Sequence, residues 1–243
     1  MQEDGVRVGF EAVSSVGDTA TMASIHTDSD VRVSRYGVDI DGFNSFLDEL
    51  PEPVERQLLY VDEIGQMQLH FDHFKSLVER WLSLDNPFVG TITKVFEDDF
   101  TSKLRDREDV AIIEVDAENR DELAGVLGTL VVNVTLLPRS GTEQSAELTR
   151  LIRKYSESRS YTQLRKLFKN ALVYVAEGKV NKQEDGSYIV EGNTDSHKIE
   201  VVQGGHFSCD CDLFNGRGQY ESASGECSHI QSVLLVGGNH LEE

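Results

Sequence analysis

Cysteine, proline and tryptophan are scarce in this sequence of 243 residues, which contains three, four and one of them respectively. Three cysteines cannot pair evenly, which argues against a fold held together by several disulfides. No apolar run approaches the roughly 20 residues that a membrane-spanning helix needs. The N-terminal stretch also lacks the basic and apolar segments of a secretory signal. We therefore expect a cytoplasmic globular protein with no membrane contact.

Basic residues are few as well: 23 Lys and Arg stand against 43 Asp and Glu, for a net charge of -20. This balance argues against a surface that coats nucleic acid, because phosphates would be repelled. The exception is residues 148–182, where nine basic and two acidic side chains give +7. Residues 1–147, with 12 basic and 30 acidic side chains, carry -18, and residues 183–243, with two and 11, carry -9. An adaptation to high salt and an ordinary acidic protein both account for the overall charge.

The N-terminal part, to about residue 135, alternates strand-like and helix-like stretches. The predicted strands are 6–13, 20–27, 58–65, 88–93 and 110–115, and the predicted helices are 41–50, 71–84 and 98–107. The first two strands flank a Ser-Val-Gly-Asp turn, which predicts a hairpin. The stretch 58–65 begins with four apolar residues, which is typical of a strand buried on both faces of a parallel sheet. The alternation predicts an α/β sheet with helices on its faces.

The C-terminal part begins after a polar segment, 138–145, that contains Pro and Gly. Beyond it, residues 146–177 have a helical pattern with Gly178 as its C-cap. The stretches 188–192 and 197–211 are predicted strands, and 230–236 a short helix. We accordingly divide the chain into an α/β domain (1–137), a helical linker with basic residues (138–164) and a small C-terminal module (165–243).

All three cysteines fall within nineteen residues, as Cys209-Asp-Cys211 and Cys227-Ser-His229. Two close ligand pairs separated by a loop suit tetrahedral Zn²⁺. A one-residue spacer places both sulfurs of the first pair on one side of a strand, and the second pair begins a helix. Four protein ligands leave no open position, so the predicted site is structural. The alternatives are scattered cysteines beside a surface histidine, or a role for His206, whose spacing fits no second pair.

At these residues the sequence resembles the SWIM zinc finger, whose pattern is CxC, a variable loop and then CxH. The resemblance covers residues 165–238, including the strand-rich stretch before Cys209 and the apolar helix after His229. It implies a small ββα zinc module that is attached to another domain and binds DNA or proteins. Which of these two partners is bound stays open.

The strand LLYVDEIG, at residues 58–65, ends in Asp62 and Glu63. Apolar strands often end in acids at the edge of a sheet, which is the structural interpretation. The same pattern is also that of a Walker B strand. There the Asp helps to hold Mg²⁺ and the Glu polarises the attacking water.

Further segments in the same order resemble a small family of P-loop nucleoside-triphosphatases first known from thermophiles. They are RVGFEAV, SRYGVDIDGF, VDEIGQMQL, FVGTIT and VAIIEVDAENRDEL, and they lie within residues 5–135. The resemblance implies that Asp62 is the magnesium-associated acid and Glu63 the water-activating one. The chain departs from the family at Gln66 and Gln68, where charged residues are usual, and at Thr93, where His is common.

The larger departure is that no GxxxxGK[ST] motif occurs in the 243 residues. This loop supplies the backbone N–H groups, Lys and hydroxyl that hold the phosphates and Mg²⁺. Its absence suggests a misassigned start, a truncated gene or a degenerate remnant, and Mg²⁺ is expected only if the site is completed. The strand that precedes the loop would be central, so its loss predicts exposed edges that a second chain could fill.

Two functions follow. The first is a zinc-binding protein that docks DNA or a partner protein and carries an inactive nucleoside-triphosphatase-like domain. The alternative is a nucleoside-triphosphatase whose Walker A segment is missing from these residues. Candidate phosphate contacts lie in the basic segment: Arg150, Arg153, Arg165, Lys166 and Lys169. The simpler interpretation of these five is a solvated helix face that pairs with the acidic excess of the chain.

Overall fold

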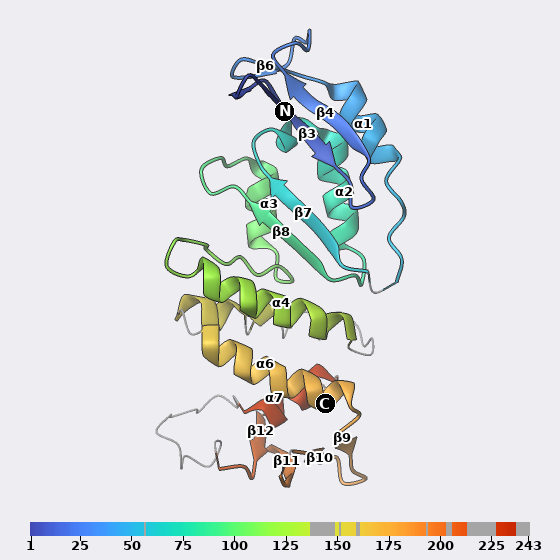
Figure 1. Cartoon of the computed structure of the whole chain (residues 1–243). Coiled ribbons are helices and arrows are strands. Elements are labelled where there is room, and N and C mark those ends of the chain that lie inside the picture. Colours follow the sequence, from blue (N-terminus) through green and yellow to red (C-terminus); the bar gives the residue numbers. More distant parts are fainter. Residues whose placement is uncertain are drawn as a thin grey trace. The chain divides into compact units, whose positions relative to one another are not determined.

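The structure is a computed structural model, and it describes most of the chain. The described residues are 1–55, 57–136, 149–150, 152–158, 161–192, 194–202, 206–212 and 227–236. The chain forms two compact units, Met1–Ser102 and Lys103–Glu243 (Figure 1). The three-domain division expected from the sequence differs from these units and stays a prediction. Its first boundary, after residue 137, lies outside the described residues.

The N-terminal unit is mixed α/β. Its strands are β1 (Gln2–Glu3), β2 (Val6–Arg7), β3 (Gly9–Val13), β4 (Thr19–Ser24), β5 (Arg32–Val33), β6 (Tyr36–Val38), β7 (Leu59–Ile64) and β8 (Phe88–Ile92). Its helices are α1 (Ile40–Asp48), the 3₁₀ turn η1 (Gln68–His70) and α2 (Asp72–Leu82), and α3 (Asp99–Asp106) begins in it. The three predicted helices are therefore present, with ends that differ by one or two residues.

An antiparallel sheet of order β3-β4-β6-β5 forms one part of this unit. The predicted hairpin is confirmed, since β3 pairs with β4 and Ser14 N donates to Asp18 O at 2.8 Å across the turn. Helix α1 begins where the Asp39 carboxylate accepts a hydrogen bond from Gly42 N at 2.9 Å, which satisfies one of its free donors. Its residues Phe43 and Leu47, one turn apart, are buried, and the Phe43 ring contacts that of Phe71 at 4.5 Å.

Strands β7 and β8 form a separate parallel pair, so the expected parallel sheet is present but limited to two strands within the described residues. The prediction that β7 is buried on both faces is wrong. Leu59 and Val61 are buried, whereas Tyr60 between them is 59% exposed. The side chains of a strand alternate between its faces, and only one face of this pair is covered. The uncovered face carries the polar end of the strand.

The predicted strand at 110–115 is also wrong: the described backbone there forms no strand. The carbonyl of Val110 instead accepts hydrogen bonds from Arg153 Nε at 3.2 Å and Nη2 at 2.6 Å. Arg153 Nη2 also donates to the carbonyl of Arg107. A guanidinium thus satisfies backbone groups in a segment whose apolar pattern had predicted pairing with a strand.

The C-terminal unit contains a long helix that the sequence analysis did not predict. Its elements are α4 (Arg120–Leu136), α6 (Tyr161–Ala176), β9 (Val180–Lys182), β10 (Tyr188–Glu191), β11 (Ser196–Val202), β12 (His206–Cys209) and α7 (Ser228–Leu235). Residues 149–150 and 152–157 are also helical, and Ser158 forms a turn before α6. The predicted helix over 146–177 is therefore present in part.

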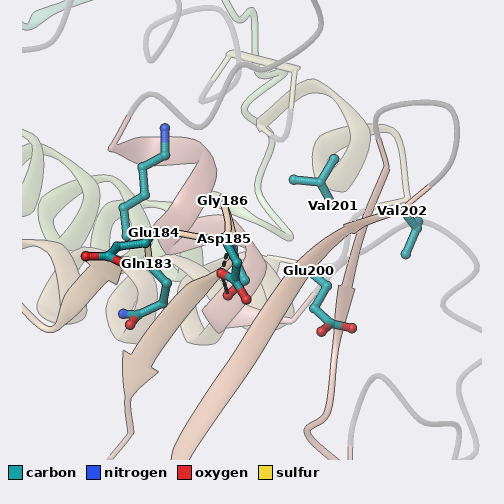
Figure 2. Close-up of a pocket in the computed structure, with 9 residues that line it drawn as sticks. Gln183, Glu184, Asp185, Gly186, Glu200, Val201 and Val202 are labelled. Atoms are coloured by element: carbon teal, nitrogen blue, oxygen red, sulfur yellow. Dashed lines mark hydrogen bonds between the residues drawn. The ribbon is translucent and has the colours of Figure 1, made fainter.

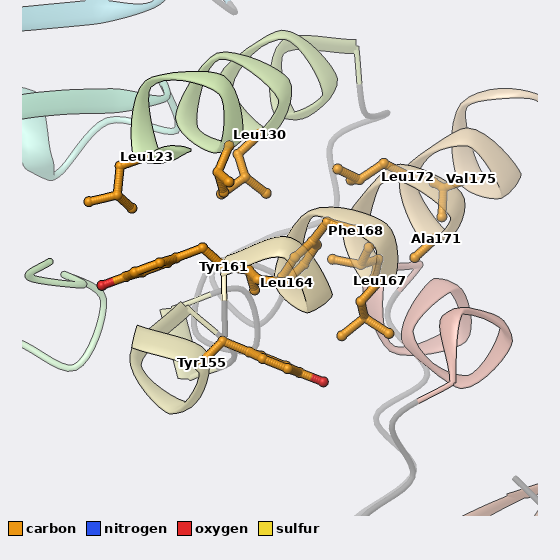
Figure 3. Close-up of a cluster of buried hydrophobic side chains, with 12 residues drawn as sticks. Leu123, Leu130, Tyr155, Tyr161, Leu164, Leu167, Phe168, Ala171, Leu172 and Val175 are labelled. Carbon is orange, nitrogen blue, oxygen red and sulfur yellow. The ribbon is translucent and has the colours of Figure 1, made fainter. Parts of the chain in front are cut away.

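Helix α6 is the centre of this unit, and its buried side chains join α4 to α7. One apolar cluster takes Leu123, Val126 and Leu130 from α4 and Leu235 from α7 (Figure 3). The α6 residues in the cluster are Tyr161, Leu164, Leu167, Phe168, Ala171, Leu172 and Val175. The helix ends as predicted at Gly178, whose φ of +67° favours glycine. There Lys179 N donates to Tyr174 O at 2.8 Å and satisfies a terminal carbonyl.

The last strands form an antiparallel sheet of order β12-β11-β10-β9. Residue 199 on β11 pairs with both Tyr188 and Cys209, so the middle of the sheet aligns with the first cysteine. Helix α7 contributes Ile230 and Val233 to a second core that also contains the three cysteines. The arrangement is four strands followed by a helix, larger than the expected ββα unit. No helix among the described residues is both long and apolar enough to cross a membrane.

Candidate functional site

The first candidate site lies at the carboxyl end of β7, where the side chains of Asp62 and Glu63 are both exposed. Thr91, on the parallel strand β8, donates a hydrogen bond from Oγ1 to Asp62 Oδ1 at 2.6 Å. Partial burial and then the negative charge of Asp62 raise the pKa of the Tyr60 phenol. Asp62 is thus an exposed carboxylate held by the neighbouring strand. Carboxylate oxygen is a ligand type that suits Mg²⁺.

The Glu63 carboxylate folds back over Gly65. A Cβ at Gly65 would lie 2.3 Å from Glu63 Oε1, so glycine leaves the room that this carboxylate uses. The same Cβ position is 3.2 Å from Gln68 Oε1, a buried atom without a hydrogen-bond partner among the described residues. Glu63 and the Gln68 amide therefore share the space beside Gly65. The structure places both predicted acids at the carboxyl end of β7, where Asp62 accepts a hydrogen bond from Thr91 and the Glu63 carboxylate lies beside Gly65.

The second candidate site lies between β12 and α7, where the structure brings together all four predicted zinc ligands. Cys209 ends β12, and Cys211 follows two residues later, as expected for two sulfurs on one side of an extended segment. Cys227 is the N-cap of α7, and its Sγ accepts a hydrogen bond from Ile230 N at 3.4 Å. His229 lies in the first turn of that helix. A strand end and a helix start thus each supply two ligands.

The ligand atoms of these four residues lie within 4.8 Å of one another. Cys209 Sγ and His229 Nδ1 are 3.8 Å apart. Zinc bonds of about 2.3 Å to sulfur and about 2.0 Å to nitrogen imply ligand atoms roughly 3.5 to 3.8 Å apart. The cysteines are 3%, 5% and 1% exposed and His229 is 9% exposed. The donor set fits a structural zinc ion, since it is closed, buried and of the right atoms.

The electrostatics of the three thiols also favour a bound cation at this site. Hydrogen bonds from Cys211 and Cys227, together with burial, raise the pKa of Cys209 far above its ordinary value. For Cys227 the hydrogen bond with Cys209 favours the thiolate, but the bond with Cys211 and burial together outweigh it and raise the pKa to about 12. Three thiols crowded in a core repel each other as thiolates. A bound dication removes this conflict, because metal ligation deprotonates the thiol.

The five basic candidates do not form one surface. Arg165, Lys166 and Lys169 lie on the exposed side of α6, away from its buried cluster. Arg150 is exposed on the helical segment before α6. Arg153 is half-buried, and its guanidinium binds the backbone carbonyls of residues 107 and 110. The structure therefore gives Arg153 a role in the fold and leaves three cations together on α6.

A groove of about 590 Å³ lies on the sheet of the C-terminal unit, beside the turn between β9 and β10 (Figure 2). Its lining is the turn 182–187 and the strand segment 200–202, and it contains none of the predicted site residues. The turn is held by Asp185, which accepts hydrogen bonds from Ser187 N at 3.0 Å and Ser187 Oγ at 2.6 Å. The groove is thus separate from both candidate sites.

Sequence reasoning missed the residues that support each site. Thr91 lies in a strand that was predicted, but nothing in the sequence paired it with Asp62. Tyr174 and His197 also escaped notice, although their rings lie 5.4 Å and 4.1 Å from the ring of His229. The alternation of side chains along a strand could have identified His197. His197 and Ile199 are two residues apart and therefore lie on the same face of β11, and Ile199 pairs with Cys209.

Comparison with known proteins covers the N-terminal half. The profile of the NTPase family matches residues 1–127. Nucleoside-triphosphatase THEP1 of Thermotoga sp. (strain RQ2) is 32% identical over 136 residues, which are 55% of this chain and 78% of that protein. The protein of the same name from Natranaerobius thermophilus is 36% identical over 124 residues, 48% of this chain and 68% of that protein. The crystal structure of THEP1 from Aquifex aeolicus has a TM-score of 0.45 and 24% identity, and the match covers 51% of this chain and 77% of that one.

The chain belongs to the NTPase family. The matched residues include both acids at the end of β7 and reach into α4. Of the two functions expected from the sequence, the alternative, a nucleoside-triphosphatase, therefore has more support than a zinc-binding protein with an inactive remnant. The family profile ends at residue 127, before the four predicted zinc ligands.

Proposed function

We propose that residues 1–127 supply the magnesium-binding and water-activating part of a nucleoside-triphosphatase, which cleaves a nucleoside triphosphate to the diphosphate and phosphate. The observation that carries the proposal is the exposed Asp62–Glu63 pair at the end of a parallel strand, with Thr91 bonded to Asp62. Membership in the NTPase family and the names of its relatives in Thermotoga and Natranaerobius support the same activity.

Each residue of this site has a separate role in the proposal. Asp62 holds the hydration shell of Mg²⁺, and Thr91 fixes the orientation of that carboxylate. Glu63, which is not tied to Thr91, accepts a proton from the attacking water. Bound Mg²⁺ would neutralise the charge that develops on the phosphate oxygens.

The phosphate cradle has to come from a segment with a GxxxxGK[ST] motif, and these 243 residues contain none. We expect no turnover by the 243-residue chain alone. The edges of β7 and β8 that have no strand partner among the described residues offer a place for the strand that accompanies such a motif. That strand could belong to a longer form of this chain or to a second chain.

The test compares the 243-residue chain with a form extended by the GxxGxGKT-bearing segment of a family member, in a steady-state assay with Mg²⁺ and ATP or GTP. Hydrolysis should occur in the extended form alone. Glu63→Gln and Asp62→Asn should each lower kcat by roughly 10²-fold or more, and Glu11→Gln, an exposed acid on β3, should leave it unchanged. Turnover by the unextended chain that disappears in Glu63→Gln would contradict the proposal, as would an inert extended form that folds and binds nucleotide.

A second function rests on a different observation, the four ligand atoms within 4.8 Å of each other. We propose that Cys209, Cys211, Cys227 and His229 hold one structural Zn²⁺ that fastens β12 to α7. Metal analysis of the purified, reduced chain should find one zinc per molecule. Well under one zinc per chain in the folded protein would contradict it.

The resemblance to SWIM modules leaves DNA or a protein as the partner of this region. We propose nucleic acid contact through the exposed cations Arg165, Lys166 and Lys169 of α6. Replacing Arg165 and Lys166 by Ala should weaken binding to an oligonucleotide and reduce its salt dependence by about one unit for each cation that no longer neutralises a phosphate. Absence of binding at low salt would favour a protein partner. Lys198→Ala, a cation on β11, is the control.

A further inference from the structure

His197 lies against the zinc site without being one of its four ligands. Its ring centroid is 4.1 Å from that of His229, with 33° between the two ring planes. The backbone of Gly192 closes in on the same rings: a Cβ there would lie 3.6 Å from His197 Cδ2 and 3.7 Å from His229 Nε2. His197 thus contacts His229, one of the two predicted ligands at the start of α7.

The same imidazole also contacts the residue that lies between the two cysteines of the first ligand pair. His197 Nδ1 is 3.0 Å from Asp210 Oδ1, and Asp210 is the single residue between Cys209 and Cys211. The strand register sustains this contact, because Asp210 N donates to Lys198 O at 3.3 Å just beyond the Ile199–Cys209 pair. One side chain therefore bridges the two halves of the ligand set, which are separated by fifteen residues of chain.

This bridge has little to offer as a source of folding energy. The side chains of His197 and Asp210 are 23% and 56% exposed, and water weakens a polar contact between side chains that are open to it. Its geometry is more informative. A residue that holds both a ligand ring and the turn between two ligand sulfurs fixes their separation before and after the ion is bound.

We propose that His197, oriented by Asp210, is a positioning residue that keeps the four zinc ligands at binding distance. This inference rests on the zinc function proposed above. When the bridge is intact, an ion that loses one ligand is recaptured, because the ring of His229 and the Cys209–Cys211 turn cannot separate. When the bridge is broken, the two ligand pairs move apart and the ion leaves sooner.

The test measures the rate of zinc release from the full 243-residue chain to an excess of a chromogenic chelator. His197→Ala removes both contacts and should speed release by about 10- to 100-fold. His197→Phe keeps the stacked ring, and Asp210→Ala keeps the imidazole, so each should have a smaller and similar effect. The double variant His197→Phe/Asp210→Ala should release zinc no faster than either single variant, because both break one interaction. Lys198→Ala, adjacent on β11, is the matched control and should release zinc at the wild-type rate.

Substitution of Co²⁺ for Zn²⁺ distinguishes a positioning role of His197 from a role in stability alone. The ligand-field absorption of Co²⁺ should shift in His197→Phe and in Asp210→Ala, which both keep all four ligands, and should stay close to wild type in Asp210→Glu, which keeps a carboxylate partner for His197. If His197→Phe only lowers the thermal stability, while the spectrum and the release rate stay at wild type, the inference is wrong.

The outcomes separate this inference from the zinc function itself. A wild-type chain with well under one zinc would overturn the zinc function. If the wild-type chain binds one zinc and all the variants release zinc at the wild-type rate, the positioning role alone is overturned. Zinc retained by His229→Ala but released by His197→Ala would show that His197 is a ligand, and two zinc ions falling to one in Asp210→Ala would make the pair a second site. Each of these last two results also overturns the inference.

Discussion

The two candidate sites differ in their relation to the core around them. Asp62 and Glu63 are both exposed at the end of β7, and neither side chain belongs to the buried core of their unit. The three cysteines and His229 are buried together with Ile199 and Val233. An exposed carboxylate pair can be changed without disturbing packing, whereas a buried ligand set cannot. Stability and chemistry should therefore be separable in the first site and inseparable in the second.

The largest effect is expected when one of the three thiolates is removed. Cys211→Ser should reduce bound zinc to well below one per chain and unfold the C-terminal sheet, because structural zinc contributes about 10 to 16 kcal/mol in small zinc modules. Hydrogen exchange should show that β9 to β12 are no longer protected while β3 and β4 still are. Ser208→Ala, beside Cys209 on β12, is the control and should behave as wild type. A sheet that stays protected without zinc would show that its apolar core suffices.

The apolar core of the same unit gives the next largest effect. Phe168 is fully buried between α4 and the rest of the cluster on α6. Phe168→Ala should lower the free energy of unfolding of this unit by about 3 to 5 kcal/mol, measured by urea denaturation of the zinc-loaded chain. Val201→Ala, at a position 41% exposed, should change it by less than about 0.5 kcal/mol. Equal effects of the two changes would mean that the metal, and not the core, determines stability.

A smaller effect is expected at the exposed site. Thr91→Val removes the hydrogen bond to Asp62 and should lower the stability of the N-terminal unit by no more than about 1 kcal/mol. Thr91→Ser, which keeps the hydroxyl, should be close to wild type. Chemical denaturation followed by a probe in the N-terminal unit makes the measurement. A loss of several kcal/mol in Thr91→Val would show that this site, too, is part of the fold.

The smallest effect concerns pH. Burial alone raises the pKa of Asp98, but hydrogen bonds from Thr101 and the Lys75 ammonium outweigh it and hold the pKa below its ordinary 3.8. A depressed carboxyl pKa stabilises the folded state above the unfolded value, and this contribution is lost as pH falls below about 4. Asp98→Asn, which still caps α3, should flatten the acid side of the stability profile, whereas Asp98→Ala should cost about 1 kcal/mol at neutral pH. An unchanged acid limb in Asp98→Asn would contradict this.

Local patterns predicted the elements that depend on local chemistry. The hairpin of β3 and β4, helices α1 and α2, and the end of α6 at Gly178 follow from turn residues, helical spacing and a glycine cap. The predicted strand at 110–115 failed because its apolar pattern says nothing about a neighbouring edge. Arg153, more than forty residues away in sequence, binds one of its carbonyls instead. Burial on both faces of β7 failed for the same reason, since it depends on what covers Tyr60.

The same distinction applies to the sites. The spacing of Cys209, Cys211, Cys227 and His229 predicted a set whose atoms do lie together. The partners of these sites, Thr91 for Asp62 and His197 for His229, depend on which strands become neighbours. The pairing register of the strands determines these neighbours, and a short sequence motif does not specify that register.

Helix α4 has a practical consequence for anyone who wishes to study the family-matched N-terminal part by itself. The family profile ends at residue 127, inside this helix. The buried side of α4, with Leu123, Val126 and Leu130, is covered by α6, which lies beyond the end of the family match. A protein expressed only to the family border would end in the middle of a helix and expose its apolar side to water. The end of the family match and the end of a stable folded fragment therefore differ. A fragment that folds well should either stop before α4 or continue through α6.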